Sequence, residues 1–269
     1  MTIAFIGAGN MAISLVRGLL ETGTAPTTII AADPSQEQRT KAANLGIKTS
    51  EDNNTAIRQA EVVVIAVKPQ IAADVVKSLD SITPQQLVIS IAAGINLESL
   101  QSWLPNNQPI VRCMPNTPAL VGAGMTALYA NAAVNPAHLS AAERVLEAAG
   151  KVIWVNEESM LDAVTAVSGS GPAYFFLLME HMIKAGTELG LDAQTSKALT
   201  LQTAYGAALM AQQATESVTT LRENVTSPAG TTEAALNKML EQHVPEAVVS
   251  ALHAAHQRSI ELAKEFGKP

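Results

Sequence analysis

A glycine-rich turn near the N-terminus is the first feature of this sequence with recognisable chemistry. Gly7, Gly9 and Ala12 form the pattern G-x-G-x-x-A, directly after a short apolar run and at the start of a helical pattern. The first glycine of such a turn permits the tight bend, the second lets the backbone approach a pyrophosphate, and the small third residue allows close helix–strand packing. The helix N-terminus then offers free N–H groups to phosphate oxygens. The pattern in this context predicts a dinucleotide-binding site.

The residues that follow leave the type of dinucleotide open. Asp33 lies where an acidic residue grips the adenosine ribose of NAD. Ser35 and Arg39 follow closely, and a hydroxyl and a guanidinium can instead receive the 2′-phosphate of NADP, which Asp33 would repel unless it is turned away. NADPH and NADH are therefore both retained as expected cofactors.

Two more segments are expected beside the cofactor. Val67, Lys68 and Pro69 follow a continuously apolar run, and Ala92-Ala93-Gly94 ends the next one. Because the carboxyl ends of strands in a doubly wound sheet face the cofactor crevice, both segments should approach it. Taken singly, each is also compatible with an ordinary loop before a helix.

Loops in the second half of the chain suit a small carboxylate. Residues 168–174 place two glycines before a proline, and residues 227–233 lead into another helix with Thr231 and Thr232 at its start. Helix N-termini carry unpaired N–H donors and partial positive charge. Ordinary helix capping is the alternative for either loop alone. His253 and His256 share a helical face without a third ligand, so no metal site is expected.

The elements that must position these residues change in type along the chain. Short apolar runs alternate with helical patterns up to about residue 161, and include residues 2–7, 28–32, 47–49, 61–67, 87–91 and 110–113, with weaker strand patterns at 124–129 and 151–155. Beyond it only helices are expected, at 173–189, 193–212, 232–242 and 245–266. The pattern predicts an α/β Rossmann-type domain over residues 1–161 and an all-α domain over residues 162–269. Ser35 and Gln38 have the spacing of a capping box.

Composition excludes several classes of protein. The chain has 269 residues, and because 48% of them are hydrophobic we expect a folded protein. Its net charge is −7, so we expect no nucleic-acid partner. One cysteine, Cys113, fits a reducing cytoplasm and a buried structural thiol. The N-terminus resembles a strand rather than a signal peptide, and no apolar run approaches the roughly 20 residues of a membrane helix, so a soluble protein is expected.

The segment Ala173–Met179 is apolar around its whole helical circumference. Such a helix must be buried on all sides, which a helical domain of this size hardly achieves alone. We therefore expect this helix to be buried against a second subunit, in an obligate homo-oligomer. The alternative is that it forms the central helix of a monomeric bundle.

The order of the motifs resembles the pyrroline-5-carboxylate reductase family along essentially the whole chain. The agreement covers F-I-G-A-G-N-M at Phe5–Met11, A-V-K-P-Q at Ala66–Gln70, S-I-A-A-G at Ser90–Gly94, R-C-M-P-N-T-P at Arg112–Pro118, D-A-V-T-A-V-S-G-S-G-P-A-Y at Asp162–Tyr174 and N-V-T-S-P-A-G-T-T at Asn224–Thr232. The first is generic to Rossmann proteins, whereas the last three are highly specific to this family.

The resemblance implies an NAD(P)H-dependent cytoplasmic enzyme that reduces 1-pyrroline-5-carboxylate to L-proline, the last step of proline biosynthesis. It implies interlocked dimers, which often build larger rings, with the threonine loop reaching the partner's cofactor cleft. Together with the glycine turn, it places cofactor contacts on Gly7, Ala8, Gly9, Asn10, Met11, Ser35, Asn53, Val67, Lys68, Pro69, Ala93 and Asn224. Substrate contacts are expected on Glu158, Gly230, Thr231 and Thr232, the last directed at the ring nitrogen. The family usually has glycine where Ala229 stands, so a positive φ there would cost about 1 kcal/mol.

Two other functions are compatible with parts of the sequence. A β-hydroxyacid dehydrogenase also joins a Rossmann domain to a helical one, but it needs a base, commonly a lysine after a glycine-rich helix start, and residues 172–179 contain none. A non-catalytic dinucleotide sensor would keep the glycine turn without needing Thr231 and Thr232.

Overall fold

A computed structural model of the chain describes residues 1–267. Residues 1–170 and the segment that begins at Ala255 form one compact unit, and residues 171–254 form another. In the part of the chain that the structure describes, no helix combines the length and the apolar character that a bilayer crossing requires.

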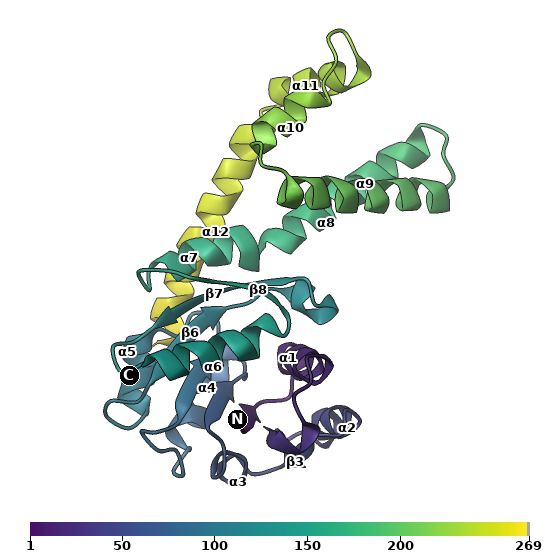
Figure 1. The fold of residues 1–269 in the computed structure, drawn as a ribbon. Coiled ribbons are helices and arrows are strands. Elements are labelled where there is room, and N and C mark those ends of the chain that lie inside the picture. The colour runs from purple at the N-terminus through teal and green to yellow at the C-terminus, as the bar shows by residue number, and fades with distance from the viewer. Residues whose placement is uncertain (268–269) are drawn as a thin grey trace. The chain divides into compact units, whose positions relative to one another are not determined.

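The first unit is built on a β-sheet, whose strands are drawn as arrows in Figure 1. The sheet has eight strands in the order β3-β2-β1-β4-β5-β6-β7-β8. Its first six strands run parallel in the order typical of dinucleotide-binding Rossmann folds, β7 runs antiparallel to β6, and β8 is parallel to β7. The strands are β1 (Ile3–Ile6), β2 (Ile29–Ala32), β3 (Lys48–Ser50), β4 (Val62–Ile65), β5 (Leu87–Ser90), β6 (Ile110–Met114), β7 (Gly124–Ala130) and β8 (Gly150–Trp154).

Two apolar cores cover the two faces of this sheet. The helices α1 (Asn10–Glu21), α2 (Gln36–Ala43) and α6 (Pro136–Glu147) bury their apolar sides in one core. The other core contains side chains of α3 (Asn53–Ile57), α4 (Pro69–Lys77) and α5 (Leu97–Trp103). Because both faces are covered, β1, β4 and β5 are buried along their whole length, which explains their continuous apolar sequences.

The end of the first unit is helical. After β8 come α7 (Met160–Val164) and a short π-helix at Thr165–Gly169. The C-terminal part of α12 (Val244–Phe266) belongs to the same unit, where the Ser259 hydroxyl donates to Asp162 Oδ1 at 2.7 Å. Two 3₁₀ turns complete the unit, at Pro26–Thr28 and Thr117–Val121.

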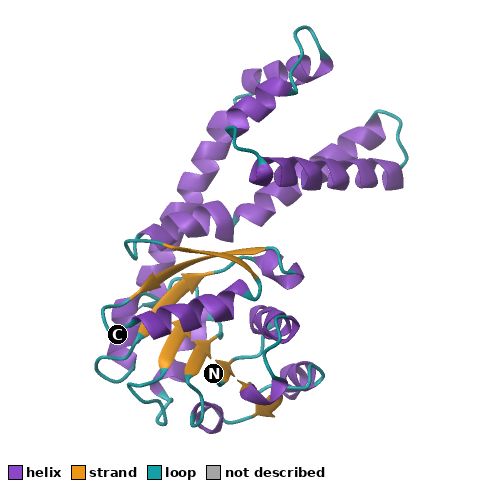
Figure 2. Ribbon diagram, in the orientation of Figure 1, coloured by secondary structure: helices purple, strands orange, loops and turns teal. Residues whose placement is uncertain are grey.

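The second unit consists of helices and their connecting loops (Figure 2). It contains α8 (Gly171–Glu188), α9 (Ala193–Gln213), α10 (Val218–Asn224), α11 (Thr231–Glu241) and the beginning of α12. The helices α8 and α9 pack together, and the Ser196 hydroxyl of α9 donates to the Ile183 carbonyl at 2.8 Å. In the single chain, Gly171, Ser196 and Thr200 are the only buried residues of 171–254, and no large apolar side chain of this segment is buried.

The expected fold class, an α/β Rossmann-type domain followed by helices, is confirmed. The compact units divide at residue 170, whereas the change from strands to helices led us to expect a border at 161. The reason is that α7 packs against β6 and β7, and that the end of α12 returns to the first unit. The expected capping box at Ser35 is wrong: the Ser35 side chain caps nothing, and its backbone N–H donates to Asp33 Oδ1.

Candidate functional site

The glycine turn after β1 requires glycine at its first position for a steric reason. Gly7 has a φ of +97°, and its N–H donates to the Ala32 carbonyl at the end of β2. A Cβ at this position would lie 2.6 Å from the Ala66 carbonyl oxygen beyond β4. The turn is thus pressed between the ends of β2 and β4, where only glycine combines the backbone angle with the available space.

Gly9 is different, because nothing in the chain demands a glycine there. It forms the N-cap of α1 with an ordinary φ of −70°, and a Cβ added to it would meet no atom within 4 Å. No side chain caps α1, and no acidic residue occupies its first turn. The uncapped N–H groups and the open space beside them fit a phosphate group that approaches the backbone closely.

A cavity of about 310 Å³ opens beside this helix N-terminus. Its lining comes from the start of α1 and from the carboxyl ends of β4, β5 and β6, which are neighbours in the sheet. The lining residues are Gly9, Asn10, Met11, Ala66, Val67, Lys68, Ile91, Ala93, Met114 and Pro115. The structure therefore brings together six of the residues expected at the cofactor: Gly9, Asn10, Met11, Val67, Lys68 and Ala93. Pro69 follows directly as the first residue of α4.

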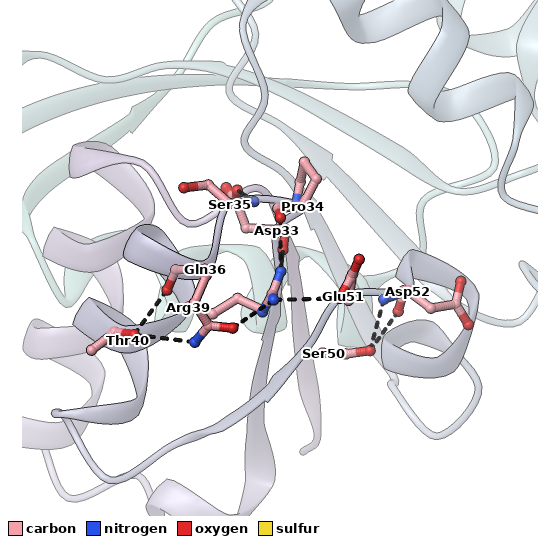
Figure 3. A network of polar contacts seen from close by, with 9 residues as sticks. All are labelled: Asp33, Pro34, Ser35, Gln36, Arg39, Thr40, Ser50, Glu51 and Asp52. Atoms are coloured by element: carbon pink, nitrogen blue, oxygen red, sulfur yellow. Dashed lines mark hydrogen bonds and ion pairs between the residues drawn. The ribbon is translucent and has the colours of Figure 1, made fainter.

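The loop after β2 is ordered by Asp33 and Arg39 (Figure 3). The Asp33 carboxylate accepts from Ala8 N–H through Oδ2 and from Ser35 N–H through Oδ1, both at 2.9 Å. Arg39 Nη1 donates to the Asp33 and Pro34 carbonyls at 2.8 Å, and its Nη2 lies 3.3 Å from a carboxylate oxygen of Glu51. Asp33 and Arg39, the two charged residues that we considered from the sequence for the adenosine ribose, therefore already have polar partners within the protein.

Asn53, the remaining residue of this unit that we expected at the cofactor, is the first residue of α3. Asp52 caps that helix by accepting from Asn54 N–H and Thr55 N–H. The hydrogen bond from the Thr55 hydroxyl, followed by that from its N–H, holds the pKa of Asp52 below its usual value. The cap fixes the start of α3, which is the part of the helix that carries Asn53.

Glu158 lies in the loop after β8 and joins three segments of the first unit. Its Oε1 accepts from Leu97 N–H at the start of α5, at 2.7 Å, and from Arg112 Nη1 on β6, at 2.8 Å. The Arg112 side chain is 8% exposed and that of Glu158 is 27% exposed. This ion pair was not anticipated, because its members are 46 positions apart in the sequence.

The other expected residues, Asn224, Gly230, Thr231 and Thr232, belong to the second unit. Asn224 ends α10, and Gly230 is the N-cap of α11, whose first residues are the two threonines. No side chain caps α11, so its first N–H groups are available to an anion. Ala229 has a φ of +57°. We considered a positive φ here because the family usually has glycine at this position.

Sequence reasoning missed the contribution of Met114 and Pro115 to the cavity. Their position at the carboxyl end of β6 was the available signal, because this end faces the same edge as those of β4 and β5. The π-helix reaches the same place: a Cβ at Gly169 would lie 2.5 Å from Met114 Cε, and the Asn116 amide donates to the Ser168 carbonyl at 3.1 Å. The π-helix at Thr165–Gly169 thus packs against the residues at the cavity wall.

Cys113 is buried, as expected of a structural thiol. Its Sγ lies 3.2 Å from the Ser90 carbonyl, to which it donates, and burial raises the pKa of the thiol far above its ordinary value. A thiol in this state is a poor nucleophile.

The strand order, the uncapped helix at Gly9 and the cavity at the carboxyl ends of the strands define a dinucleotide-binding protein of the Rossmann class. Two family profiles match the chain. The profile described as "Pyrroline-5-carboxylate reductase dimerisation" matches residues 158–262, and "NADP oxidoreductase coenzyme F420-dependent" matches residues 2–94.

Full-length relatives agree with the first of these profiles. A pyrroline-5-carboxylate reductase of Pseudomonas aeruginosa is 51% identical over 99% of this chain and 98% of its own length, and that of Haemophilus influenzae is 45% identical over 98% of both. The chain belongs to the pyrroline-5-carboxylate reductase family, which confirms the expected resemblance.

Solved structures of similar proteins share the fold. A pyrroline-5-carboxylate reductase from Coxiella burnetii is 42% identical with a TM-score of 0.89, and covers 97% of this chain and 98% of its own. A pyrroline carboxylate reductase from Plasmodium falciparum, solved with NADP bound, is 30% identical with a TM-score of 0.88 and covers 98% of both chains.

Proposed function

We propose that this chain reduces 1-pyrroline-5-carboxylate to L-proline with NADPH, or alternatively NADH, as the last step of proline biosynthesis. The observation that carries the proposal is the cavity beside Gly9, in a chain whose full-length relatives are pyrroline-5-carboxylate reductases. The cofactor supplies a hydride, and the protein supplies the geometry in which the imine carbon receives it.

The residues around the glycine turn fit such a cofactor. The first N–H groups of α1 would hold the pyrophosphate, and Gly9 leaves the space that a close approach needs. Ser35 and Asn53 would hold the adenosine end, whereas Val67, Lys68, Pro69 and Ala93 would hold the ribose and ring beyond the strand ends. Gly7, Ala8, Asn10, Met11 and Asn224 complete the set that we assign to the cofactor.

The loop after β2 supports a preference for NADPH over NADH. Asp33 already accepts two backbone hydrogen bonds, one on each oxygen, while the Ser35 hydroxyl caps nothing. This arrangement leaves the hydroxyl available to a 2′-phosphate and favours NADPH. The bound NADP of the Plasmodium falciparum protein supports the same choice.

The substrate residues act by positioning. An imine that reacts as its protonated iminium is already electrophilic, so a strong general acid is unnecessary. Thr232 would orient the ring nitrogen, and the N–H groups near Gly230 and Thr231, at the uncapped start of α11, would hold the carboxylate. Glu158 would form a further contact with the substrate.

The activity is tested by following the absorbance of NADPH after addition of 1-pyrroline-5-carboxylate, with chromatographic detection of proline. We expect loss of NADPH and formation of proline in equal amounts, and slower turnover with NADH at equal concentration. A protein that binds NADPH but forms no proline would be a dinucleotide sensor, and the proposal would be wrong.

Thr232 provides the sharper test of the mechanism. Thr232→Ala removes the hydroxyl assigned to the ring nitrogen and should lower kcat/KM by roughly tenfold to a hundredfold, while the thermal unfolding midpoint stays the same. Thr232→Ser is the matched control, because it keeps the hydroxyl and should retain most of the activity. Unchanged kinetics in Thr232→Ala would remove this residue from the mechanism.

The assembly we propose is a homodimer formed by the helical segment 162–269, which also contributes to substrate binding, and such dimers can join into a larger ring. The unburied apolar helices of residues 171–254 and the dimerisation profile over residues 158–262 support it. A cytoplasmic location agrees with a single, buried cysteine.

A further inference from the structure

Arg112 is an unusual residue for its position in the fold. It lies in the middle of β6 between β5 and β7, where Ile110, Val111 and Cys113 are buried apolar neighbours. Its side chain is 8% exposed. A buried guanidinium pays a large desolvation cost, so an apolar residue would stabilise this strand equally well. We therefore expect this charge to have a role beyond folding.

Within residues 1–267, the only partner of the Arg112 side chain is Glu158 Oε1, at 2.8 Å. The same oxygen accepts from Leu97 N–H, so two donors from different segments fix one oxygen of the carboxylate. The second oxygen, Oε2, has no hydrogen-bond partner among the described residues. Because the Glu158 side chain remains 27% exposed, one oxygen is held while the carboxylate still reaches the surface.

The segments that this carboxylate joins also build the cofactor cavity. Arg112 lies two residues before Met114, and Leu97 follows the loop that carries Ala93; both Met114 and Ala93 line the cavity. Glu158 itself precedes α7 and the π-helix, which packs against Met114. The ion pair is thus anchored in the same strand and loop that form the cavity wall.

We propose that Arg112 is a positioning residue for the substrate: it holds Glu158 through Oε1 so that Oε2 is presented to the ring of the imine. The inference rests on the proposed function and extends it to a residue that makes no substrate contact of its own. Arg112 also balances the charge of Glu158, so that the pair adds no net negative charge near a substrate that carries a carboxylate.

A merely structural ion pair would behave differently. It would stabilise the first unit, and its loss would affect the thermal midpoint, the KM for NADPH and the KM for the imine together. A positioning role instead confines the change to the KM for the imine and makes it depend on Glu158. The two roles are separated by a double-mutant cycle of Arg112→Met and Glu158→Gln, measured on the full-length protein.

The glutamine variant is chosen because it keeps an oxygen that can accept from Leu97 N–H while it removes the charge. We expect Arg112→Met and Glu158→Gln each to raise the KM for 1-pyrroline-5-carboxylate by roughly tenfold, with little change in the KM for NADPH. The double variant should resemble Glu158→Gln alone, because Arg112 then has no carboxylate to hold. Glu157→Gln, at the exposed neighbouring position, is the matched control and should resemble the wild type.

The inference would be overturned if Arg112→Met raised the KM for the imine by the same factor in the wild-type and Glu158→Gln backgrounds. It would also be overturned if Arg112→Met left this KM unchanged. If Arg112→Met does not fold, Arg112→Lys replaces it in the same double-mutant cycle. Arg112→Lys should cause a smaller rise in the KM for the imine, and no further rise when it is combined with Glu158→Gln. Turnover of the wild type separates the two levels: an inactive wild type overturns the proposed function, whereas an active wild type with independent effects overturns only the role of Arg112.

Discussion

At the scale of single residues, the two glycines of the N-terminal turn have different reasons to be glycine. Gly7 needs a positive φ and has the Ala66 carbonyl where a side chain would be. Gly9 has an ordinary backbone and open space around it. The first glycine is therefore required by the fold, whereas the fold does not require the second, and we infer that the phosphate we propose to bind there requires it.

This difference predicts opposite results for two otherwise identical substitutions. Gly7→Ala should lower the free energy of unfolding by about 2 kcal/mol or more, because strain and a clash act together. Gly9→Ala should leave stability within about 0.5 kcal/mol. It should weaken NADPH binding by roughly tenfold or more, equivalent to about 1.4 kcal/mol. Thermal unfolding and fluorescence titration measure the two effects. Normal NADPH affinity in Gly9→Ala would place the pyrophosphate elsewhere.

Sequence patterns at this scale locate features that depend on local residues and miss those that depend on distant partners. The turn at Gly7 and Gly9 is a local signal, so its place after β1 could be predicted, and its role at the cofactor stays a prediction. The Arg112–Glu158 pair forms only because β6 and the loop after β8 meet in the fold. Asp33 could be identified as a candidate, but its hydrogen bond to Ala8 N–H, across 25 positions, could not.

At the scale of elements, the turn between α10 and α11 contains a residue that its backbone disfavours. Ser227, Pro228, Ala229 and Gly230 have the features of a type II turn, with proline at the second position and a positive φ at the third. Gly230 N–H donates to the Ser227 carbonyl at 3.0 Å, and Ala229 N–H donates to Glu233 Oε2 at 2.7 Å. These hydrogen bonds keep the turn in place despite the alanine.

Ala229→Gly should therefore relieve strain without changing the turn. The left-handed conformation costs alanine about 1–2 kcal/mol, and the greater freedom of glycine in the unfolded chain offsets about 0.4–1 kcal/mol of that. We expect stability to rise by up to about 1.6 kcal/mol and kcat/KM to change less than about twofold. Chemical denaturation and steady-state kinetics measure the two quantities. Lower stability in Ala229→Gly would mean that the alanine methyl group makes a contact that outweighs its strain.

The elements that sequence patterns predicted best are those with the strongest periodicity. Continuous apolar runs located β4 and β5, and the long helical patterns located α8, α9 and α12 to within a few residues. The seven-residue helix α10 was missed because it is too short for a clear period, and Thr165–Gly169 was not predicted to be a π-helix. A π-helix differs from an α-helix only in its hydrogen bonds, and these depend on packing against Met114 and Asn116 rather than on local sequence.

At the scale of the whole molecule, residues 171–254 contain many apolar side chains but no apolar core of their own. Phe175 and Phe176 of α8 are 64% and 61% exposed in the single chain, and Tyr205 and Met210 of α9 are similarly exposed. These exposed side chains do not fit the monomeric alternative, in which other helices of the same chain cover α8. Leaving such a surface in water costs free energy, which supports the proposed homo-oligomer, in which a second copy of the chain covers it.

The oligomer can be tested with one charge placed on this surface. Burying a glutamate without a partner costs several kcal/mol, and a twofold interface contains the substitution twice. Phe175→Glu should therefore raise the dissociation constant of the dimer by at least about a hundredfold. Val121→Glu is the matched control, because Val121 is a valine of the first unit that is 80% exposed. Sedimentation should give dimers or larger species for the wild type and for Val121→Glu, but monomers for Phe175→Glu.

The thermal midpoint of the wild type should also rise with protein concentration, because association and folding are coupled when the helical segment has no core of its own. A monomeric wild type with a concentration-independent midpoint would contradict this account, because the exposed helices would then be stable in water without any partner.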